Sequence, residues 1–155
     1  MAFGFPLYID LNGNNCTIFG GGEYAADKAE TLLRFGARVT VISPDLCDRL
    51  VAMDEQKQIR YIPRKYYRGD CSTAMLCVAA TDNEAINIAI ATESKAKNIP
   101  VNVARPAAFG SFTFPEAIFT DAVQISLVGS VPPEKLHALR DRLQAELDVW
   151  SNKDD

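Results

Sequence analysis

The feature that most constrains this chain is a short apolar segment that runs directly into three consecutive glycines. Residues 16–19 include the β-branched Thr17 and Ile18 and suit a buried strand. Residues 20–22 are all glycine, and after them a helical pattern begins whose apolar face carries Ala25, Ala26, Ala29, Leu32 and Leu33. The order of strand, tight glycine turn and helix predicts the opening unit of an α/β domain.

The glycines have the spacing Gly20-x-Gly22-x-x-Ala25, which is typical of dinucleotide-binding turns. Gly20 permits a sharp turn, Gly22 lets a pyrophosphate approach the backbone, and Ala25 lets the helix pack close to the strand. The start of the helix adds unpaired N–H groups and the positive end of the helix dipole. The pattern favours nucleotide binding over the alternative, a glycine-rich turn in an ordinary α/β protein.

Strand-like and helix-like segments then alternate along the chain. The first helix should end near residue 35 with Gly36 as a left-handed cap, and Asp45 should cap a second helix that ends near residue 53. Another helix is expected over residues 84–97, a loop over residues 64–70, and strands over residues 38–43, 59–63, 75–80 and 100–103.

This alternation predicts a Rossmann-like, doubly wound parallel sheet with helices on both faces and right-handed crossovers. In such sheets the ligand lies at the carboxyl ends of the strands. We therefore expect one crevice that is surrounded by residues 20–24, 43–45, 81–83 and 104–106.

The pattern changes after residue 110. Strands are expected over residues 111–115 and 122–128, with a turn over 119–121, and they should form a small hairpin. A last helix should run from residue 132 to residue 150, with one face lined by Leu136, Leu139, Leu143, Leu147 and Trp150. The chain thus divides into a dinucleotide-binding domain, 1–110, and a dimerisation segment, 111–155. At the other end, residues 5–11 alternate and suit a short edge strand, where Pro6 needs no N–H partner.

Composition and charge exclude several classes of function. The net charge of −4 argues against nonspecific nucleic-acid binding. No segment is long and apolar enough to span a membrane, and the N-terminus lacks a signal-peptide pattern, so we expect a cytoplasmic protein. We expect no metal site, because the chain has a single histidine and no C-x-x-C spacing, and its cysteines should be free thiols: Cys16, Cys47, Cys71 and Cys77.

The end of the second strand bears on the choice of cofactor. The acid that usually binds the adenosine ribose is replaced there by Ser43 and Pro44, with Asp45 just after. No arginine is placed to bind a 2′-phosphate, because Arg38 lies at the opposite end of the strand. This favours NAD over NADP. The one histidine, His137, fits an amphipathic helix, and no nucleophile–base pair is visible. Hydride transfer fits this absence, since it needs positioning more than side-chain chemistry.

Longer motifs extend this pattern along the chain. They are Phe5-Pro-Leu-Tyr-Ile-Asp-Leu11, Gly20-Gly-Gly-Glu-Tyr-Ala-Ala-Asp-Lys28, Leu32-Leu-Arg-Phe-Gly-Ala-Arg-Val-Thr-Val41, Ser43-Pro44, Ala79-Ala-Thr-Asp82, Asn87 and Val101-Asn-Val103. In this order and spacing the chain resembles the precorrin-2 dehydrogenase / sirohydrochlorin ferrochelatase family, the N-terminal part of siroheme synthases. The resemblance covers residues 5–118 well and the remainder loosely.

The resemblance implies a homodimer that uses NAD to oxidise precorrin-2 to sirohydrochlorin and that dimerises through the segment after Phe112. It implies that Asn102 and Arg105 face the tetrapyrrole substrate. It also implies that NAD is held by Gly20, Gly21, Gly22, Glu23, Tyr24, Ser43, Pro44, Thr81 and Asp82.

Three features depart from the family pattern. Arg105 occupies the position of an Asp to which a catalytic role is attributed, and a reversed charge cannot preserve carboxylate chemistry. The loop over residues 128–133 lacks the usual paired glycines, and we expect the usual C-terminal helical domain to be absent. These departures favour a dehydrogenase without effective ferrochelatase activity. They leave open a non-catalytic module that binds a dinucleotide or a tetrapyrrole, and a dehydrogenase that acts on another substrate.

The basic residues also allow two interpretations. Arg105 at the mouth of the crevice suits a bidentate contact with a substrate carboxylate, or it marks a site that has lost its reaction. A basic stretch suits either attraction of an acidic tetrapyrrole or a solvated loop, and consists of Arg60, Arg64, Lys65 and Arg68.

Overall fold

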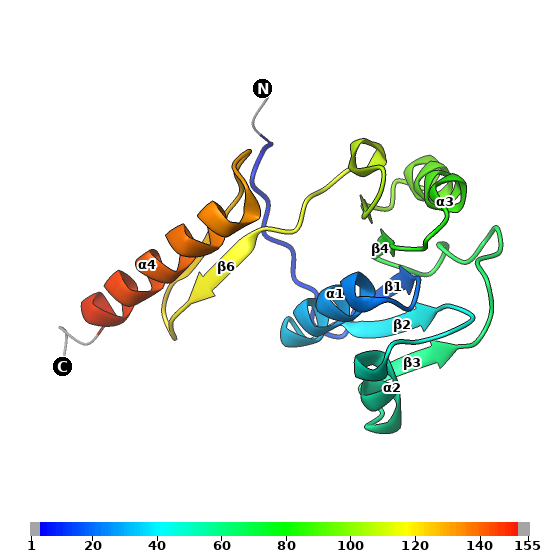
Figure 1. Ribbon diagram of the computed structural model, residues 1–155, viewed down its shortest axis with the longest axis horizontal. Coiled ribbons are helices and arrows are strands. Elements are labelled where there is room, and N and C mark those ends of the chain that lie inside the picture. The colour runs from blue at the N-terminus through cyan, green and yellow to red at the C-terminus, as the bar shows by residue number, and fades with distance from the viewer. Residues whose placement is uncertain (1–3, 152–155) are drawn as a thin grey trace. The chain divides into compact units, whose positions relative to one another are not determined.

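The computed structural model describes residues 4–151 and separates into two compact units, Met1–Phe112 and Thr113–Asp155 (Figure 1). The first unit contains a five-stranded parallel sheet with the strand order β3-β2-β1-β4-β5. The strands are β1 (Asn15–Phe19), β2 (Arg38–Ile42), β3 (Ile59–Ile62), β4 (Leu76–Ala79) and β5 (Val101–Val103). The predicted fold class, a Rossmann-like α/β sheet followed by a small hairpin and a helix, is confirmed.

Helices cover the two faces of this sheet. One face packs against α1 (Glu23–Arg34) and α2 (Asp48–Glu55), and α3 (Glu84–Ala96) lies on the other (Figure 1). The helix α1 buries small residues against β1, because Ala25, Ala26 and Ala29 are all fully buried. Small side chains bring the helix axis close to the sheet and so fix the glycine turn between β1 and α1.

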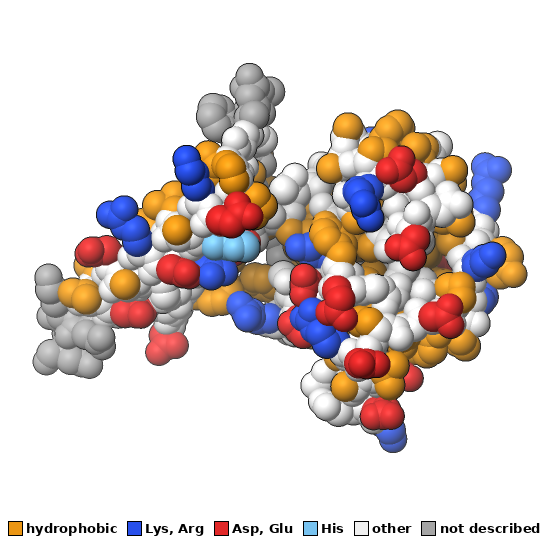
Figure 2. Space-filling view, in the orientation of Figure 1, with side chains coloured by type: hydrophobic (Ala, Val, Ile, Leu, Met, Phe, Trp, Pro, Cys, Tyr) orange, Lys and Arg blue, Asp and Glu red, His pale blue; other side chains and the backbone are white. Residues whose placement is uncertain are grey.

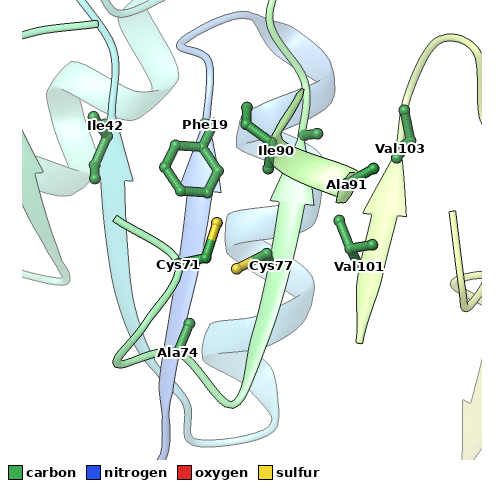
Figure 3. Close-up of a cluster of buried hydrophobic side chains, with 10 residues drawn as sticks. Phe19, Ile42, Cys71, Ala74, Cys77, Ile90, Ala91, Val101 and Val103 are labelled. Carbon is green, nitrogen blue, oxygen red and sulfur yellow. The ribbon is translucent and has the colours of Figure 1, made fainter. Parts of the chain in front are cut away.

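The core on the α3 side gathers side chains from four strands, from α3 itself and from one loop (Figure 3). Phe19 of β1 packs edge to face against Tyr66, with ring centroids 5.3 Å apart. Tyr66 and Cys71 belong to the connection between β3 and β4, which contains no helix. Figure 3 shows the sulfur atoms of Cys71 and Cys77 directed toward one another, and all four cysteines are free thiols, as expected.

The second unit is an antiparallel hairpin with one helix. Its elements are β6 (Glu116–Phe119), β7 (Gln124–Leu127) and α4 (Pro133–Ser151), and α4 packs on β6. Ile118 is its one buried side chain among the described residues, whereas Leu139 and Trp150 are 45% and 53% exposed. The apolar face of α4 predicted from the sequence is therefore only partly covered within this unit.

The expected edge strand over residues 5–11 is wrong, because this segment is irregular. Phe5 and Leu7 are 89% and 72% exposed, so no burial stabilises an extended conformation there. The chain instead turns, because the Asn12 N–H donates to the Asp10 carboxylate over 2.9 Å.

The expected cap of the second helix is also wrong. The helix begins at Asp48, with Cys47 rather than Asp45 at the cap position. The cause is a tertiary contact: the Cys47 N–H donates to the Gly21 carbonyl over 2.7 Å and holds the preceding residues against the glycine turn.

The first hairpin strand lies at 116–119 rather than at the expected 111–115, and the turn lies between Phe119 and Gln124. The Ser111 N–H donates to the Val101 carbonyl over 2.7 Å, and the Ser111 hydroxyl accepts from the Val101 N–H over 2.9 Å. These bonds tie residue 111 to β5, and Pro115 has no N–H for a ladder. The strand therefore begins after the proline.

Candidate functional site

The glycine turn lies where the direction of the strand order reverses. β1 and β4 are neighbours at the centre of the sheet, and the connections that follow them lead to helices on opposite faces. Ligands of open α/β sheets bind at this reversal point, outside the carboxyl ends of the strands. The turn after β1 and the residues after β4 therefore form one candidate cofactor site.

Two of the three glycines are required by their close neighbours. Gly20 has a φ of +116°, and a Cβ there would lie 2.2 Å from the Ala80 carbonyl oxygen. A Cβ on Gly21 would lie 1.8 Å from the carbonyl oxygen of Asp45. Both distances are below any real contact, so these glycines let the backbones of β1, β2 and β4 approach one another.

The third glycine faces open space. A Cβ on Gly22 would meet nothing within 4 Å, and Gly22 is also the cap residue of α1, where no side chain caps the helix. The first N–H groups of α1 are thus available to a bound group at the positive end of the helix dipole. This open cradle fits the pyrophosphate of a dinucleotide.

The residues at the end of β2 form one side of the turn. Ser43 is buried, and its hydroxyl lies 2.9 Å from the position of a Gly21 Cβ. Pro44 is exposed and accepts a hydrogen bond from the Tyr61 hydroxyl over 2.9 Å. The structure thus brings Ser43 to the glycine turn, and Tyr61 of β3 fixes the backbone beside it.

The residues after β4 are held by a buried asparagine. The Asn87 Oδ1 accepts from the Thr81 N–H over 3.0 Å and from the Thr81 hydroxyl over 2.7 Å, while Asn87 Nδ2 donates to the carbonyls of Thr81 and Arg105. Asn87 is fully buried. One amide therefore ties the ends of β4 and β5 together at the crevice.

Asn87 belongs to one of the motifs of the sequence, but its position there indicates no role by itself. A signal was present in the sequence, because Asn87 occupies the buried face of α3 with Ile90, Ala91 and Ser94. A polar side chain on such a face needs internal partners. Its partners were not predictable from spacing, because one of them, the Arg105 carbonyl, lies 18 residues away in the segment after β5.

Tyr24 and Asn102 were predicted for cofactor and substrate respectively, and the structure joins them. The Tyr24 hydroxyl donates to Asn102 Oδ1 over 2.7 Å, and Asn102 Nδ2 donates to the Phe112 carbonyl over 3.3 Å. Burial raises the pKa of the Tyr24 phenol, so the phenol stays protonated and keeps donating. This bond connects the first turn of α1 to β5 across the crevice.

Glu23 lies at the start of α1 and is paired with Arg49 of α2, which also contacts Asp27 and Glu30. Figure 2 shows acidic and basic side chains next to one another over α1. The Arg49 guanidinium lowers the pKa of Glu23, with a second hydrogen bond from the Cys47 thiol. Sequence reasoning missed Arg49, since only the fold brings α2 beside α1.

Asp82, another residue predicted to hold the cofactor, follows β4 and is exposed.

Arg105 follows β5, and its side chain is exposed. Its carbonyl is held by Asn87, so the backbone at this position is fixed while the guanidinium extends into solvent. Among the described residues, no side chain is paired with this guanidinium.

No group of three or more His, Cys, Asp or Glu within residues 4–151 is arranged to hold a metal ion.

A comparison with models of protein families shows to which family the chain belongs. The family model described as putative NAD(P)-binding matches residues 7–116, which is most of the chain. The chain belongs to this NAD(P)-binding family. The matched range includes the glycine turn, the residues after β2 and β4, and the Asn87 network, so the candidate site lies within it.

Siroheme synthases are similar to this family member over nearly its whole length. The siroheme synthase of Pseudoalteromonas atlantica is 34% identical over 142 residues, which cover 91% of this chain and 31% of that protein. The siroheme synthase of Nitrosospira multiformis is 35% identical over 144 residues, or 90% of this chain and 30% of that protein. The chain thus spans less than a third of the length of these relatives.

The fold has a counterpart among solved structures. SirC, a precorrin-2 dehydrogenase, superposes with a TM-score of 0.75 over 92% of this chain and 70% of its own, at 21% identity. At this identity the match establishes the fold.

No helix within residues 4–151 has both the length and the apolar composition that a membrane crossing requires.

Proposed function

We propose that this chain catalyses the NAD-dependent oxidation of precorrin-2 to sirohydrochlorin, without effective ferrochelatase activity. The observation that carries the proposal is the open cradle at Gly22, in an NAD(P)-binding family member to which siroheme synthases align over about nine-tenths of the chain. The choice of substrate follows the name of SirC, the precorrin-2 dehydrogenase with the same fold.

In this proposal each part of the site has a distinct role. NAD, when bound, supplies the hydride acceptor, and the substrate loses one hydride and one proton. Gly22 and the first turn of α1 bind the pyrophosphate, with Ser43 and Thr81 flanking it. Tyr24 holds Asn102 in a fixed orientation toward the substrate side of the crevice, through the 2.7 Å hydrogen bond. Catalysis then depends mainly on placing the two reacting carbons together.

Arg105 supports a second candidate function. Precorrin-2 carries many carboxylates, and an exposed guanidinium at the mouth of the crevice suits bidentate binding of one of them. If the Asp of the family pattern is essential, this chain binds a dinucleotide or tetrapyrrole without converting it. A dehydrogenase that acts on another substrate is the third possibility.

The deciding experiment follows precorrin-2 oxidation by absorbance, with NAD and separately with NADP, for the unmodified chain and for Arg105→Asp. We expect turnover by the unmodified chain and a preference for NAD, because Asp45 rather than an arginine follows β2. Turnover would show that the family's Asp is dispensable for the hydride step.

The negative outcomes separate the alternatives. Turnover by Arg105→Asp alone would identify a family member that lost its reaction at one position. If neither protein oxidises precorrin-2 but both bind NAD saturably in calorimetry, the chain is a binding module or a dehydrogenase that acts on another substrate. The Tyr24→Phe variant serves as a positioning control, since it should lower turnover while leaving NAD affinity nearly unchanged.

We also propose that the protein is a cytoplasmic homodimer that forms through Thr113–Asp155. The support is the partly covered apolar face of α4, where Leu139 and Trp150 are about half exposed, and the hairpin edge of β7. The four free thiols fit a reducing compartment.

A further inference from the structure

The two faces of the sheet differ in chemistry over β1, β2 and β3. Residues facing α1 and α2 are apolar and buried, as Ile18, Val39 and Val41 show. On the opposite face, the carboxyl-terminal half of the strands is also apolar, but the amino-terminal half carries Thr17, Thr40 and Arg60 in one row across the three strands.

No helix covers this polar row, because α3 packs on β4 and β5 and the connection from β3 to β4 is a loop. A groove of about 710 Å³ lies there, in the size range of small-molecule sites. Thr17 and Thr40 lie along its length, and the groove extends from Lys57 at one end of the strands to Arg64 at the other.

The groove concentrates positive charge. Among the described residues, four cationic side chains and one carboxylate, Asp70, line it, which gives a local charge of +3 in a chain whose net charge is −4. Asp70 is already neutralised by a bidentate pair with Arg64, at 2.7 and 2.9 Å. Among residues 4–151, no partner forms an ion pair or a side-chain hydrogen bond with Arg38, Lys57 or Arg60.

The register places two of these cations at a useful spacing. Arg60 pairs with Thr40 across the strands, and Arg38 lies two residues earlier on the same face of β2. Neighbouring strands about 4.8 Å apart and a rise of about 3.3 Å per residue put the Arg38 and Arg60 Cα atoms about 8 Å apart. Two guanidinium groups can therefore converge on one ligand with several anionic groups.

We propose that this groove, lined by Arg38, Lys57, Arg60 and the row of threonines, is a binding site for a small multivalent anion of the polycarboxylate or polyphosphate class. The guanidinium fork matches both carboxylate and phosphate geometry, and the threonine hydroxyls donate further hydrogen bonds. The site lies on the sheet face, apart from the glycine turn, and does not depend on the proposed dehydrogenase function.

The competing explanation is a solvated face in which Arg60 discourages edge-to-edge pairing of β3. That role requires one charge on the edge strand. It does not require Arg38, which lies on the inner strand β2, or the excess of cations over the single carboxylate, Asp70, among the described lining residues. The charge distribution favours a bound anion.

The test is titration of the full chain with tripolyphosphate and, separately, with citrate, followed by calorimetry and by backbone amide shifts in NMR spectra. We expect saturable binding that weakens with added salt, and shifts centred on Thr17, Thr40 and Arg60. Binding of one probe but not the other identifies phosphate or carboxylate as the preferred group, and acetate should bind far more weakly than either.

Matched variants complete the test. Combined Arg38→Gln and Arg60→Gln should weaken binding by about tenfold or more, since each removes charge-assisted hydrogen bonds. Arg142→Gln, which removes an exposed arginine of α4, should change nothing. Absence of saturable binding, or shifts centred on residues 20–22 with unchanged affinity in the double variant, would overturn the proposal. The shift map on the unmodified chain decides the matter even if the double variant folds poorly.

Discussion

Adjacent glycines in the turn after β1 serve different purposes, although the sequence presents them as one run. Gly21 has no room for a side chain, because its Cβ would lie 1.8 Å from a backbone oxygen, whereas Gly22 has open space around the same position. Gly21 is therefore needed for the fold, whereas Gly22 leaves the space that the proposed cofactor would occupy.

At the residue scale we predict that alanine substitutions separate these roles. Gly21→Ala should destabilise the protein by roughly 2 kcal/mol or more, because backbone atoms must move. Gly22→Ala should cost less than about 1 kcal/mol but should weaken NAD binding at least about tenfold, because the methyl group occupies the cradle. Urea unfolding and calorimetric titration with NAD measure the two effects. Equal losses of stability in both variants would contradict this assignment.

At the scale of elements, α3 is fastened to the loop between β3 and β4 by a buried carboxylate. Glu93 accepts from Lys97 Nζ over 2.6 Å and from the Gly69 N–H over 3.0 Å, and it is also hydrogen-bonded to the Tyr66 hydroxyl. Burial alone would favour the neutral acid, but the bonds from Lys97, Tyr66 and Gly69 outweigh it. They lower the pKa of Glu93 from 4.5 to about 2.

This pKa shift makes a pH-dependent contribution to stability. The contribution is fully present above the unfolded pKa of 4.5 and is lost as pH falls toward the folded value of about 2. Its size is about 3 kcal/mol at most. We predict that Glu93→Gln lowers the free energy of unfolding by about 2–3 kcal/mol near neutral pH, and that its difference from the unmodified chain narrows below about pH 4.

Urea unfolding at several pH values measures this difference. Glu55→Gln is the matched control, because Glu55 is an exposed glutamate at the end of α2. A constant difference between Glu93→Gln and the unmodified chain at all pH values would show that the carboxylate is not held ionised by its neighbours.

At the scale of the whole molecule, the two units have unequal means of stabilisation. Met1–Phe112 contains nearly all of the buried apolar side chains, whereas Ile118 is the one such residue of the described part of Thr113–Asp155. A hairpin and a single helix with so small a core are marginal by themselves. The second unit therefore needs additional contacts, which the proposed dimer would supply.

We predict that a chain ending at Phe112 folds, binds NAD and is monomeric, while the full chain is dimeric. The reason is that the first unit keeps its sheet, three helices and glycine turn intact. Light scattering over a range of concentrations gives the association state, and circular dichroism gives the thermal midpoint. A monomeric full chain at every concentration would remove the basis for dimerisation through α4.

Much of the fold could be predicted from local patterns. Strand β1, the glycine turn and α1 follow from short-range chemistry, because an apolar β-branched segment, three glycines and an amphipathic run allow few alternatives. Where a segment depended on a distant partner, prediction failed. Residues 111–115 fit a strand by composition, but Ser111 is bonded to Val101 of β5. Cys47 displaces Asp45 from the helix cap through its bond to Gly21.

The candidate site likewise contains features that local sequence predicts and features that depend on distant partners. Residues close along the chain were enough to predict the α/β class, the dinucleotide-type spacing of Gly20 and Gly22, and the place of Ser43 and Thr81 at strand ends. Long-range packing joined Tyr24 to Asn102 across 78 residues and left the part of one sheet face over β1, β2 and β3 without a covering helix. Such contacts depend on which elements pack together, and packing is decided by the summed burial of the whole chain rather than by any local pattern.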